Sequence, residues 1–242
     1  MYDIEQQRAQ QRMHILVVGQ VCEQIAPCVA DASMAFSHIG GAANIARMLG
    51  ELGVNVGLQC VTGNDAHAVD TQLSQFLALL PQYDMAVVSD FPSSHGGNLA
   101  PMMQAAAASG RRMAVVPSQP DFARYAGASL LISSESMLRM ALRGWDDEAE
   151  LTHKVQRLSA GCSLGAVLVA RAGPALSLYT AHGPIHFPMS GATDVDALAA
   201  SAAYFLCACG SSYLAAVKTS QTECASRMER TLEGGVLGEY AM

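Results

Sequence analysis

The chain has 242 residues, of which 51% are hydrophobic and 14% are charged, and its formal net charge is −7. A chain of this length and apolar content can bury a sizeable core as one domain, which excludes a disordered protein. The acidic balance offers no basic surface for a phosphate backbone, so a nucleic acid partner is not expected.

The two ends of the chain carry no clear targeting signal. Residues 1–13 are polar, so we expect an N-terminal tail over 1–13 and one domain over 14–242. The segment 197–217 is uncharged, but it holds three serines and two tyrosines, which favours a buried helix over a membrane span. The seven cysteines lack zinc-site spacing, which indicates buried reduced thiols, no metal site and a cytoplasmic location.

Short apolar runs that predict buried strands alternate with patterns that predict helices. The strands are expected at 14–19, 54–61, 85–88, 113–116, 129–132, 165–170, 175–179 and 184–187. The helices are expected at 40–53, 66–80, 98–109, 135–142, 147–158, 196–209 and 220–233. This alternation predicts an α/β fold, namely a doubly wound, mostly parallel sheet with helices on both faces.

The stretch from His38 to Gly53 is the most informative part of the sequence. Gly40 and Gly41 open a helix, and Asn44 lies in its first turn. This arrangement resembles the N-terminal signature of the PfkB/ribokinase family of sugar kinases. The resemblance implies that both glycines and Asn44 bind a sugar. A helix cap with close helix–sheet packing is the alternative explanation for the same residues.

Three further segments extend the resemblance towards the bacterial heptose-phosphate kinases of that family. Residues 84–91 read DMAVVSDF, 121–131 read DFARYAGASLL, and 167–171 read VLVAR. They are similar to the motifs D-x-x-V-x-S-D-Y, D-F-x-R-Y-x-G-A-x-L-L and L-L-V-T-R of those kinases, in the same order. The resemblance therefore covers about residues 14–233.

The family implies a specific set of catalytic parts. A small β lid covers the sugar, and the phosphates of ATP lie against a helix N-terminus that carries the motif G-A-G-D. The backbone amides there form an anion hole, the aspartate is the base, and magnesium bridges the phosphates. ATP and magnesium are thus the expected cofactors only if the chain is an active kinase.

The lid and the sugar-binding carboxylates are the first departures from the family. Only residues 20–39 precede the signature and 65–84 read as one helix, so the lid is expected to be largely absent. Gln20 stands where the family has a carboxylate that binds sugar hydroxyls, and an amide binds them less strongly. Asp90 ends a strand and either contacts a ligand or forms a turn before Pro92.

The nucleotide side departs as well. Residues 116–118 read VPS where the family has D-P-K, and the motif N-x-x-E falls on Ser134 and Met137. A thioether is a poor partner for the magnesium shell. Arg171 faces the nucleotide if the resemblance holds, and a surface arginine is the alternative.

The anion-hole motif has an ambiguous register. One register matches G-A-G-D to Gly191, Ala192, Thr193 and Asp194. It keeps Asp194 as the base. Matching the following helix makes Asp196 the base instead.

A third register, counted back without gaps from Gly210, puts Ala197 at the base position. The hole is altered in every register. A β-branched residue such as Thr193 fits poorly where the backbone must approach phosphate, and a second aspartate repels it.

These departures affect parts that act together in one reaction. Our first hypothesis is a degenerate PfkB/ribokinase-like protein that is weak or inactive as a kinase and acts by binding a small phosphorylated ligand or a protein partner. The alternative is an active ATP-dependent sugar or sugar-phosphate kinase with Asp194 as the base. A third hypothesis is a scaffold protein that forms homo- or hetero-oligomers through surfaces exposed by loss of the lid.

Overall fold

The structure is a computed structural model of the full chain. It describes residues 13–19, 41–60, 66–90, 99–173, 175–188, 194–208, 212–215 and 217–218, and for residues 66–69 the backbone alone. The predicted helix at 220–233 and the segment 20–39 lie outside the described residues.

One eight-stranded sheet runs through the described part of the chain, with the order β2-β1-β3-β4-β5-β6-β7-β8. The strands are β1 (His14–Gly19), β2 (Asn55–Cys60), β3 (Met85–Ser89), β4 (Arg112–Val116), β5 (Leu130–Ser134), β6 (Val167–Ala170), β7 (Ala175–Thr180) and β8 (Gly183–Pro188). The pairs from β2 to β6 are parallel, whereas β6–β7 and β7–β8 are antiparallel. The prediction of a mostly parallel sheet is therefore confirmed.

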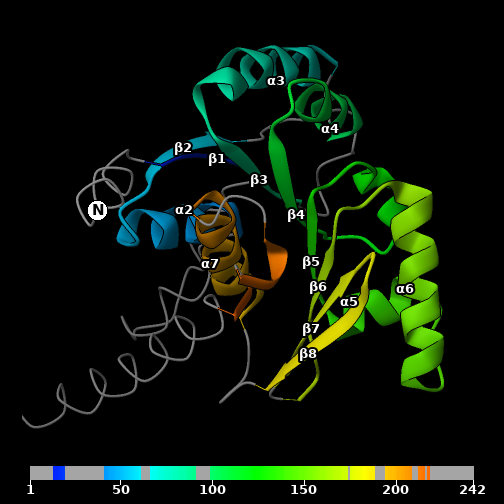
Figure 1. Ribbon diagram of the computed structural model, residues 1–242. Coiled ribbons are helices and arrows are strands. Elements are labelled where there is room, and N and C mark those ends of the chain that lie inside the picture. Colours follow the sequence, from blue (N-terminus) through cyan, green and yellow to red (C-terminus); the bar gives the residue numbers. More distant parts are fainter. Residues whose placement is uncertain are drawn as a thin grey trace, which may run out of the picture.

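Helices cover both faces of the sheet (Figure 1). They are α2 (Gly41–Glu51), α3 (Ala66–Leu79), α4 (Leu99–Ala108), α5 (Glu135–Ala141), α6 (Glu148–Cys162) and α7 (Val195–Ala208), with short 3₁₀ helices η2 (Leu80–Gln82) and η3 (Phe122–Tyr125). Helices α2 and α7 pack on one face, and α3 to α6 pack on the other.

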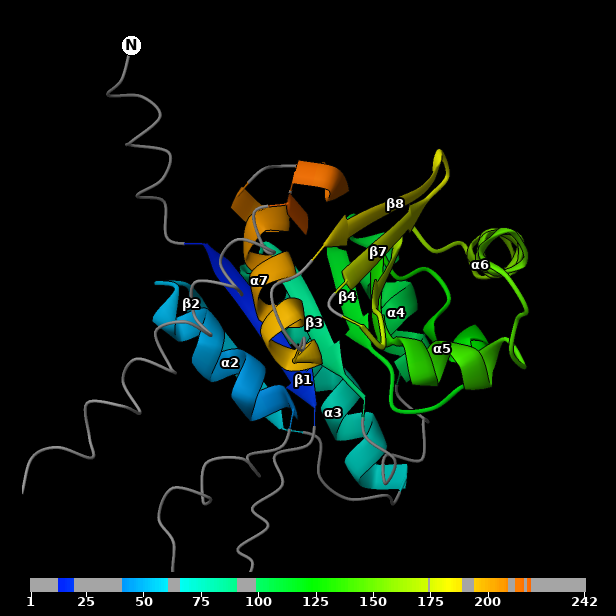
Figure 2. The ribbon, with the colours of Figure 1, turned by 90° about the horizontal axis from the view of Figure 1, so that it is seen from below.

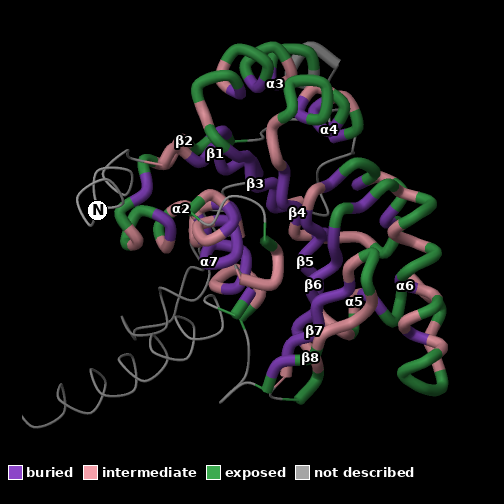
Figure 3. Tube along the Cα trace, in the orientation of Figure 1, coloured by how far each residue is buried: buried purple, intermediate pink, exposed green. Residues whose placement is uncertain are grey.

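The two faces of the sheet divide the core because successive side chains on a strand point in opposite directions. On β1, Ile15 and Val17 pack under α2 and α7, whereas Leu16 and Val18 pack under the helices of the other face. The central strands are buried along most of their length (Figure 3). This double burial explains why the strands read as continuous apolar runs in the sequence.

Helices α2 and α7 lie side by side on their face of the sheet, as Figure 2 shows from below. Helix α2 begins at Gly41, and α7 begins at Val195. A hydrogen bond between Asn44 and Asp196 joins their first turns. Two helix N-termini therefore meet beside the carboxyl ends of β1 and β3.

Two findings bear on the sequence predictions. Cys60 is exposed at the end of the edge strand β2, so the prediction of buried thiols is wrong for this cysteine. Between residues 66 and 84 the described chain is helical over α3 and η2 and contains no strand. Among the described residues, no helix is both long and apolar enough to cross a membrane.

A pair of glycines at the end of α2 yields a stability prediction. Gly50 lies inside the helix with open space around it, whereas Gly53 has a φ of +82° just after it. We expect Gly50→Ala to stabilise the protein by about 0.5–1 kcal/mol, because alanine favours a helix interior, and Gly53→Ala to destabilise it by about 1 kcal/mol. Urea unfolding of both variants checks this, and shifts of the same sign would contradict it.

Candidate functional site

The candidate site lies where α2, α7 and β3 approach one another closely. A Cβ atom at Gly41 would lie 2.5 Å from Ser89 Oγ and 3.3 Å from Asp196 Oδ1. A Cβ atom at Gly19 would lie 2.5 Å from the carbonyl oxygen of Ser89. The clash at Gly19 is with backbone, so that position requires glycine, whereas a side chain at Gly41 would displace the Ser89 hydroxyl and crowd the Asp196 carboxylate.

Asn44 and Asp196 form a hydrogen-bonded pair at the two helix N-termini. Asn44 Nδ2 donates to Asp196 Oδ2 at 3.2 Å. Asn44 Oδ1 accepts from Arg47 at 3.0 Å, and Arg47 also pairs with Glu51. The amide of Asn44 is thus oriented from both sides, with its NH₂ group directed at the carboxylate.

The carboxyl group of Asp196 holds its proton more tightly than an ordinary aspartate does. Burial raises its pKa from 3.8 to about 6, the hydrogen bond from Asn44 lowers it, and the charge of Asp194 raises it. Burial dominates because the first turn of α7 packs against α2. A carboxyl group with a pKa near 6 can accept and release a proton close to neutral pH.

Asp194 has a different role in the same turn. Its Oδ1 accepts from the backbone N–H of Asp196 at 3.0 Å, and its carbonyl oxygen accepts from Leu198 N at 3.0 Å. These are the bonds of a helix N-cap. Of the two candidate bases, Asp194 therefore caps α7, whereas Asp196 faces Asn44 and Gly41.

Asp90 ties together three elements at the carboxyl end of β3. Its Oδ2 accepts from Ser118 Oγ at 2.9 Å and from the Tyr125 hydroxyl at 2.5 Å. Burial and the neighbouring carboxylate together raise the pKa of Tyr125 above its usual value. These contacts connect β3 with the loop after β4 and with η3, and they give Asp90 a structural role.

Loss of the hydrogen bond between Tyr125 and Asp90 should lower the stability of the protein. Tyr125→Phe removes one of the donors to Asp90 inside the core, and we expect it to destabilise the protein by about 2 kcal/mol. Tyr204→Phe is the matched control, because the Tyr204 hydroxyl bonds to no other described residue, and it should change stability by less than about 0.5 kcal/mol. Thermal unfolding compares the two, and equal shifts would contradict the assignment.

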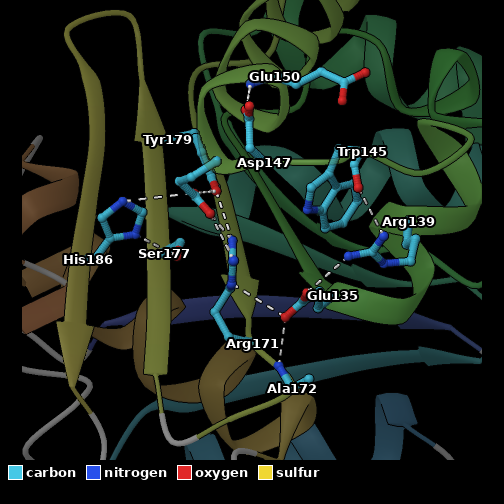
Figure 4. Close-up of polar contacts among 11 residues, drawn as sticks. Glu135, Arg139, Trp145, Asp147, Glu150, Arg171, Ala172, Ser177, Tyr179 and His186 are labelled. Carbon is cyan, nitrogen blue, oxygen red and sulfur yellow. Dashed lines mark hydrogen bonds and ion pairs between the residues drawn. The ribbon is translucent and has the colours of Figure 1, made fainter.

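Arg171 follows β6 and lies in a closed polar network (Figure 4). Its guanidinium donates to both oxygens of Glu148, at 2.9 and 3.4 Å, and to the Tyr179 hydroxyl at 3.1 Å. Its Nε lies 3.4 Å from Glu135 Oε2. Burial lowers the pKa of Arg171, but the bonds and charges of these partners outweigh it and raise that pKa. The motif at residues 167–171 did not predict that Glu135 and Glu148 pair with Arg171.

The residues at the magnesium motif do not fit the metal. Ser134 Oγ accepts from Met137 N at 3.2 Å and so serves as the N-cap of α5. The Met137 side chain packs against the core on the α5 face of the sheet. Within the described part of the chain, no group of three His, Cys, Asp or Glu side chains could hold a metal ion.

The structure brings together only part of the predicted site. Gly41, Asn44 and Asp196 converge, Asp194 caps the same helix, and Asp90 and Arg171 are held by partners of their own. Five predicted residues lie outside the described residues: Gln20, Gly40, Gly191, Ala192 and Thr193. Sequence reasoning missed Ser89, although it belongs to the D-x-x-V-x-S-D-Y match.

The chain is similar in sequence to two kinds of curated protein, although no protein-family model matches it. It is 34% identical over 125 residues to the bifunctional protein HldE of Shewanella amazonensis, a match that covers 51% of this chain and 26% of that protein. It is 30% identical over 123 residues to the D-beta-D-heptose 7-phosphate kinase of Bordetella bronchiseptica, covering 48% of this chain and 39% of that kinase. The matched segment thus spans well under half of either relative.

The fold is similar to that of solved carbohydrate kinases. Two structures of phosphofructokinase-2 from Escherichia coli, one in complex with fructose-6-phosphate and one of a tetrameric inhibited form, each match with a TM-score of 0.65. Each match covers 89% of this chain and 93% of that chain at 13% identity. At this identity the likeness concerns the fold, and it agrees with the ribokinase-like architecture expected from the sequence.

Proposed function

We propose that the chain, which is similar in sequence to heptose 7-phosphate kinase and has a ribokinase-like fold, binds a sugar or sugar phosphate and transfers phosphate weakly or not at all. The Asn44–Asp196 pair is the proposed ligand-binding centre. The observation that carries the proposal is the engagement of Arg171 by two carboxylates. Asn44 and Asp196 are hydrogen-bonded to each other at the proposed sugar site, whereas the arginine expected on the nucleotide side is already paired with carboxylates.

Electrostatics supports weak nucleotide binding. Glu135 and Glu148 lie within 3.4 Å of the Arg171 guanidinium, and Arg139 lies 3.7 Å from Glu135, so the positive charge of Arg171 is already balanced inside the protein. A polyphosphate would have to compete with these carboxylates for Arg171. The Ser134 cap and the packed Met137 offer no carboxylate for a magnesium shell.

The acceptor side remains suited to a polyhydroxylated ligand. A carboxylate accepts hydrogen bonds from hydroxyls, and an amide both donates and accepts them. Asn44 and Asp196 supply these groups side by side at two helix N-termini. Binding of a sugar here requires no catalysis.

One observation favours the second candidate, an active carbohydrate kinase. Asp196 combines a pKa of about 6 with a place in the first turn of α7, which suits a general base. Under this alternative Asp196 takes the role that one sequence register assigned to Asp194.

Calorimetry and a phosphotransfer assay separate the two candidates. We expect binding of heptose 7-phosphate or fructose 6-phosphate that Asn44→Ala weakens at least tenfold, and no ATP-dependent phosphorylation of either sugar. Robust phosphorylation that Asp196→Asn abolishes would establish the active kinase and overturn our proposal. If Asp194→Ala abolished it instead, the base would be Asp194.

The Arg171 network has its own test. If the carboxylates exclude nucleotide, the double variant Glu135→Gln/Glu148→Gln should bind ATP more tightly than the unmodified protein. Adding Arg171→Met to this background is the matched control and should remove the gain. Unchanged ATP affinity in the double variant would show that the network does not limit nucleotide binding.

Self-association is a further part of the proposal. The related fold of phosphofructokinase-2 occurs in a tetrameric form. β2 is an edge strand of the described sheet and exposes Leu58 and Cys60. We expect a homo-oligomer in light scattering, and a monomer at high concentration would contradict this.

A further inference from the structure

The edge strand β2 has a row of backbone groups that point away from the sheet. The N–H of Asn55 donates to the carbonyl oxygen of Met13 at 2.8 Å, which fixes the direction of each residue on the strand. In a parallel pair every second residue bonds to the neighbouring strand, so the row that includes Asn55 faces β1. The other residues direct their N–H and C=O groups outwards, namely Val56, Leu58 and Cys60. In the described part of the chain β2 pairs with β1 alone, so this outward row is open to a further strand.

The side chains of β2 do not protect this open edge (Figure 1). None of its six residues is charged and none is proline. Leu58 stands at the centre of the outward row with 42% of its surface exposed, and Val56 beside it packs against the core on the α2 face. Natural edge strands usually carry charges, prolines or bulges that prevent pairing. An uncharged edge without proline and with an exposed leucine at its centre therefore favours pairing with another strand.

The opposite edge of the sheet, β8, is protected. Two of its six residues, Pro184 and Pro188, have no N–H group, so β8 offers few donors to a further strand. Pairing of β2 with β8 of another molecule would also leave an open edge at each end and would lead to a filament. Pairing of β2 with a second β2 uses the same open row twice and closes after two molecules. The contrast between the two edges therefore selects a second copy of β2 as the partner.

We propose that β2 pairs in antiparallel orientation with β2 of a second copy of this chain, about a two-fold axis at Leu58. In this register Leu58 lies opposite the partner's Leu58, and Val56 lies opposite the partner's Cys60. The outward groups of each such pair face one another, so each pair exchanges two N–H···O=C hydrogen bonds. The two sheets become one continuous sheet, and the exposed leucines pack across the axis. The interface deepens the self-association proposed above and rests on it.

Light scattering of the unmodified protein and of Leu58→Lys tests the interface. We expect a dimer, or a multiple of one, for the unmodified protein. Leu58→Lys places two like charges opposite each other at the axis and should raise the dissociation constant at least tenfold, with the fold unchanged by circular dichroism. Leu77→Lys is the matched control, because it is the same substitution at a leucine of α3 that exposes 47% of its surface. It should keep the dissociation constant within twofold.

Disulfide formation tests the register. In a Cys60→Ser background, Leu58→Cys should form an intermolecular disulfide under mild oxidation, because the two copies of this position face each other. The Cα atoms of such a hydrogen-bonded pair lie about 5.5 Å apart, a separation that a disulfide can span. Leu77→Cys in the same background is the matched control and should remain uncross-linked on a non-reducing gel.

The outcomes separate the interface from the other proposals. A monomer at high concentration, as expected if another segment or another protein covers β2, would overturn the self-association together with the interface. An oligomer that Leu58→Lys leaves intact would overturn the β2 interface alone, as would equal cross-linking of the two cysteine variants. Sugar-phosphate titration of the same samples reports on the binding function independently, so its failure in an intact dimer would leave the interface standing.

Discussion

Asp196→Asn is expected to stabilise the protein by about 2–3 kcal/mol at pH 7.5, equivalent to a rise of roughly 5–10 °C in melting temperature. The carboxyl group of Asp196 has a pKa of about 6 in the folded protein against an ordinary value of 3.8. At neutral pH the folded protein must therefore hold a carboxylate in a place that disfavours its charge. An asparagine keeps the oxygen that accepts from Asn44 and removes that charge.

The raised pKa of Asp196 also predicts the pH range over which this carboxyl group lowers the stability of the protein. Below about pH 4 the carboxyl group is protonated in both the folded and the unfolded chain, so it costs no stability there. Between about pH 4 and pH 6 the unfolded chain has lost this proton and the folded chain retains it, so stability falls as the pH rises. Above about pH 6 the full cost persists. The stability difference between the variant and the unmodified protein should thus grow from pH 4 to pH 6 and then level off.

Urea unfolding of both proteins at a series of pH values measures this difference. Asp194→Asn is the matched control, because it is the same substitution two residues away and asparagine is also a good N-cap. It should change stability by less than about 0.5 kcal/mol at pH 7.5. A difference for Asp196→Asn that stays constant between pH 4 and pH 7 would contradict the raised pKa.

A stabilising substitution at this position would also bear on function. Side chains that cost stability gather at binding and catalytic sites, where their chemistry is needed. Asp196→Asn should therefore separate the two properties: the variant folds more stably, and it binds sugar phosphate less tightly because an amide is a weaker acceptor than a carboxylate.

The fold was predictable from the sequence because its signals are local. The run from His14 to Gly19 is apolar at every buried position, and the structure has β1 with the same bounds. The glycine at 110, with its φ of +66°, ends α4 as its position after an alanine-rich helix suggests. Buried parallel strands and helices that end at glycine each have a characteristic pattern within a short segment of sequence. The order of the elements could therefore be predicted from these local patterns.

The site was less predictable because its contacts join distant segments. Asn44 and Asp196 are 152 residues apart, and only their shared face of the sheet brings them together. Glu148 lies on α6, 23 residues before Arg171, and no motif connects the two. The roles of Asp194 and Asp196 differ through helix geometry alone, since one precedes the first turn of α7 and the other lies within it.

Gly19→Val is expected to destabilise the protein by about 3 kcal/mol or more. A Cβ atom at Gly19 would lie 2.5 Å from the carbonyl oxygen of Ser89 and 2.7 Å from Cβ of Ala42. Gly19 is paired in register with Ser89 on the neighbouring strand, so the added atoms have no flexible side chain to displace. Either β1 and β3 separate at their carboxyl ends, or α2 moves away from the sheet.

Both responses would also damage the proposed binding site, because Ser89 and the start of α2 belong to it. Gly173→Val is the matched control, since a Cβ atom there meets nothing within 4 Å, and it should change stability by less than about 0.5 kcal/mol. Thermal unfolding and sugar-phosphate titration are measured on both variants. If Gly19→Val were as stable as the control and bound sugar phosphate with the same affinity, the close approach of β1, β3 and α2 would not be what forms the site.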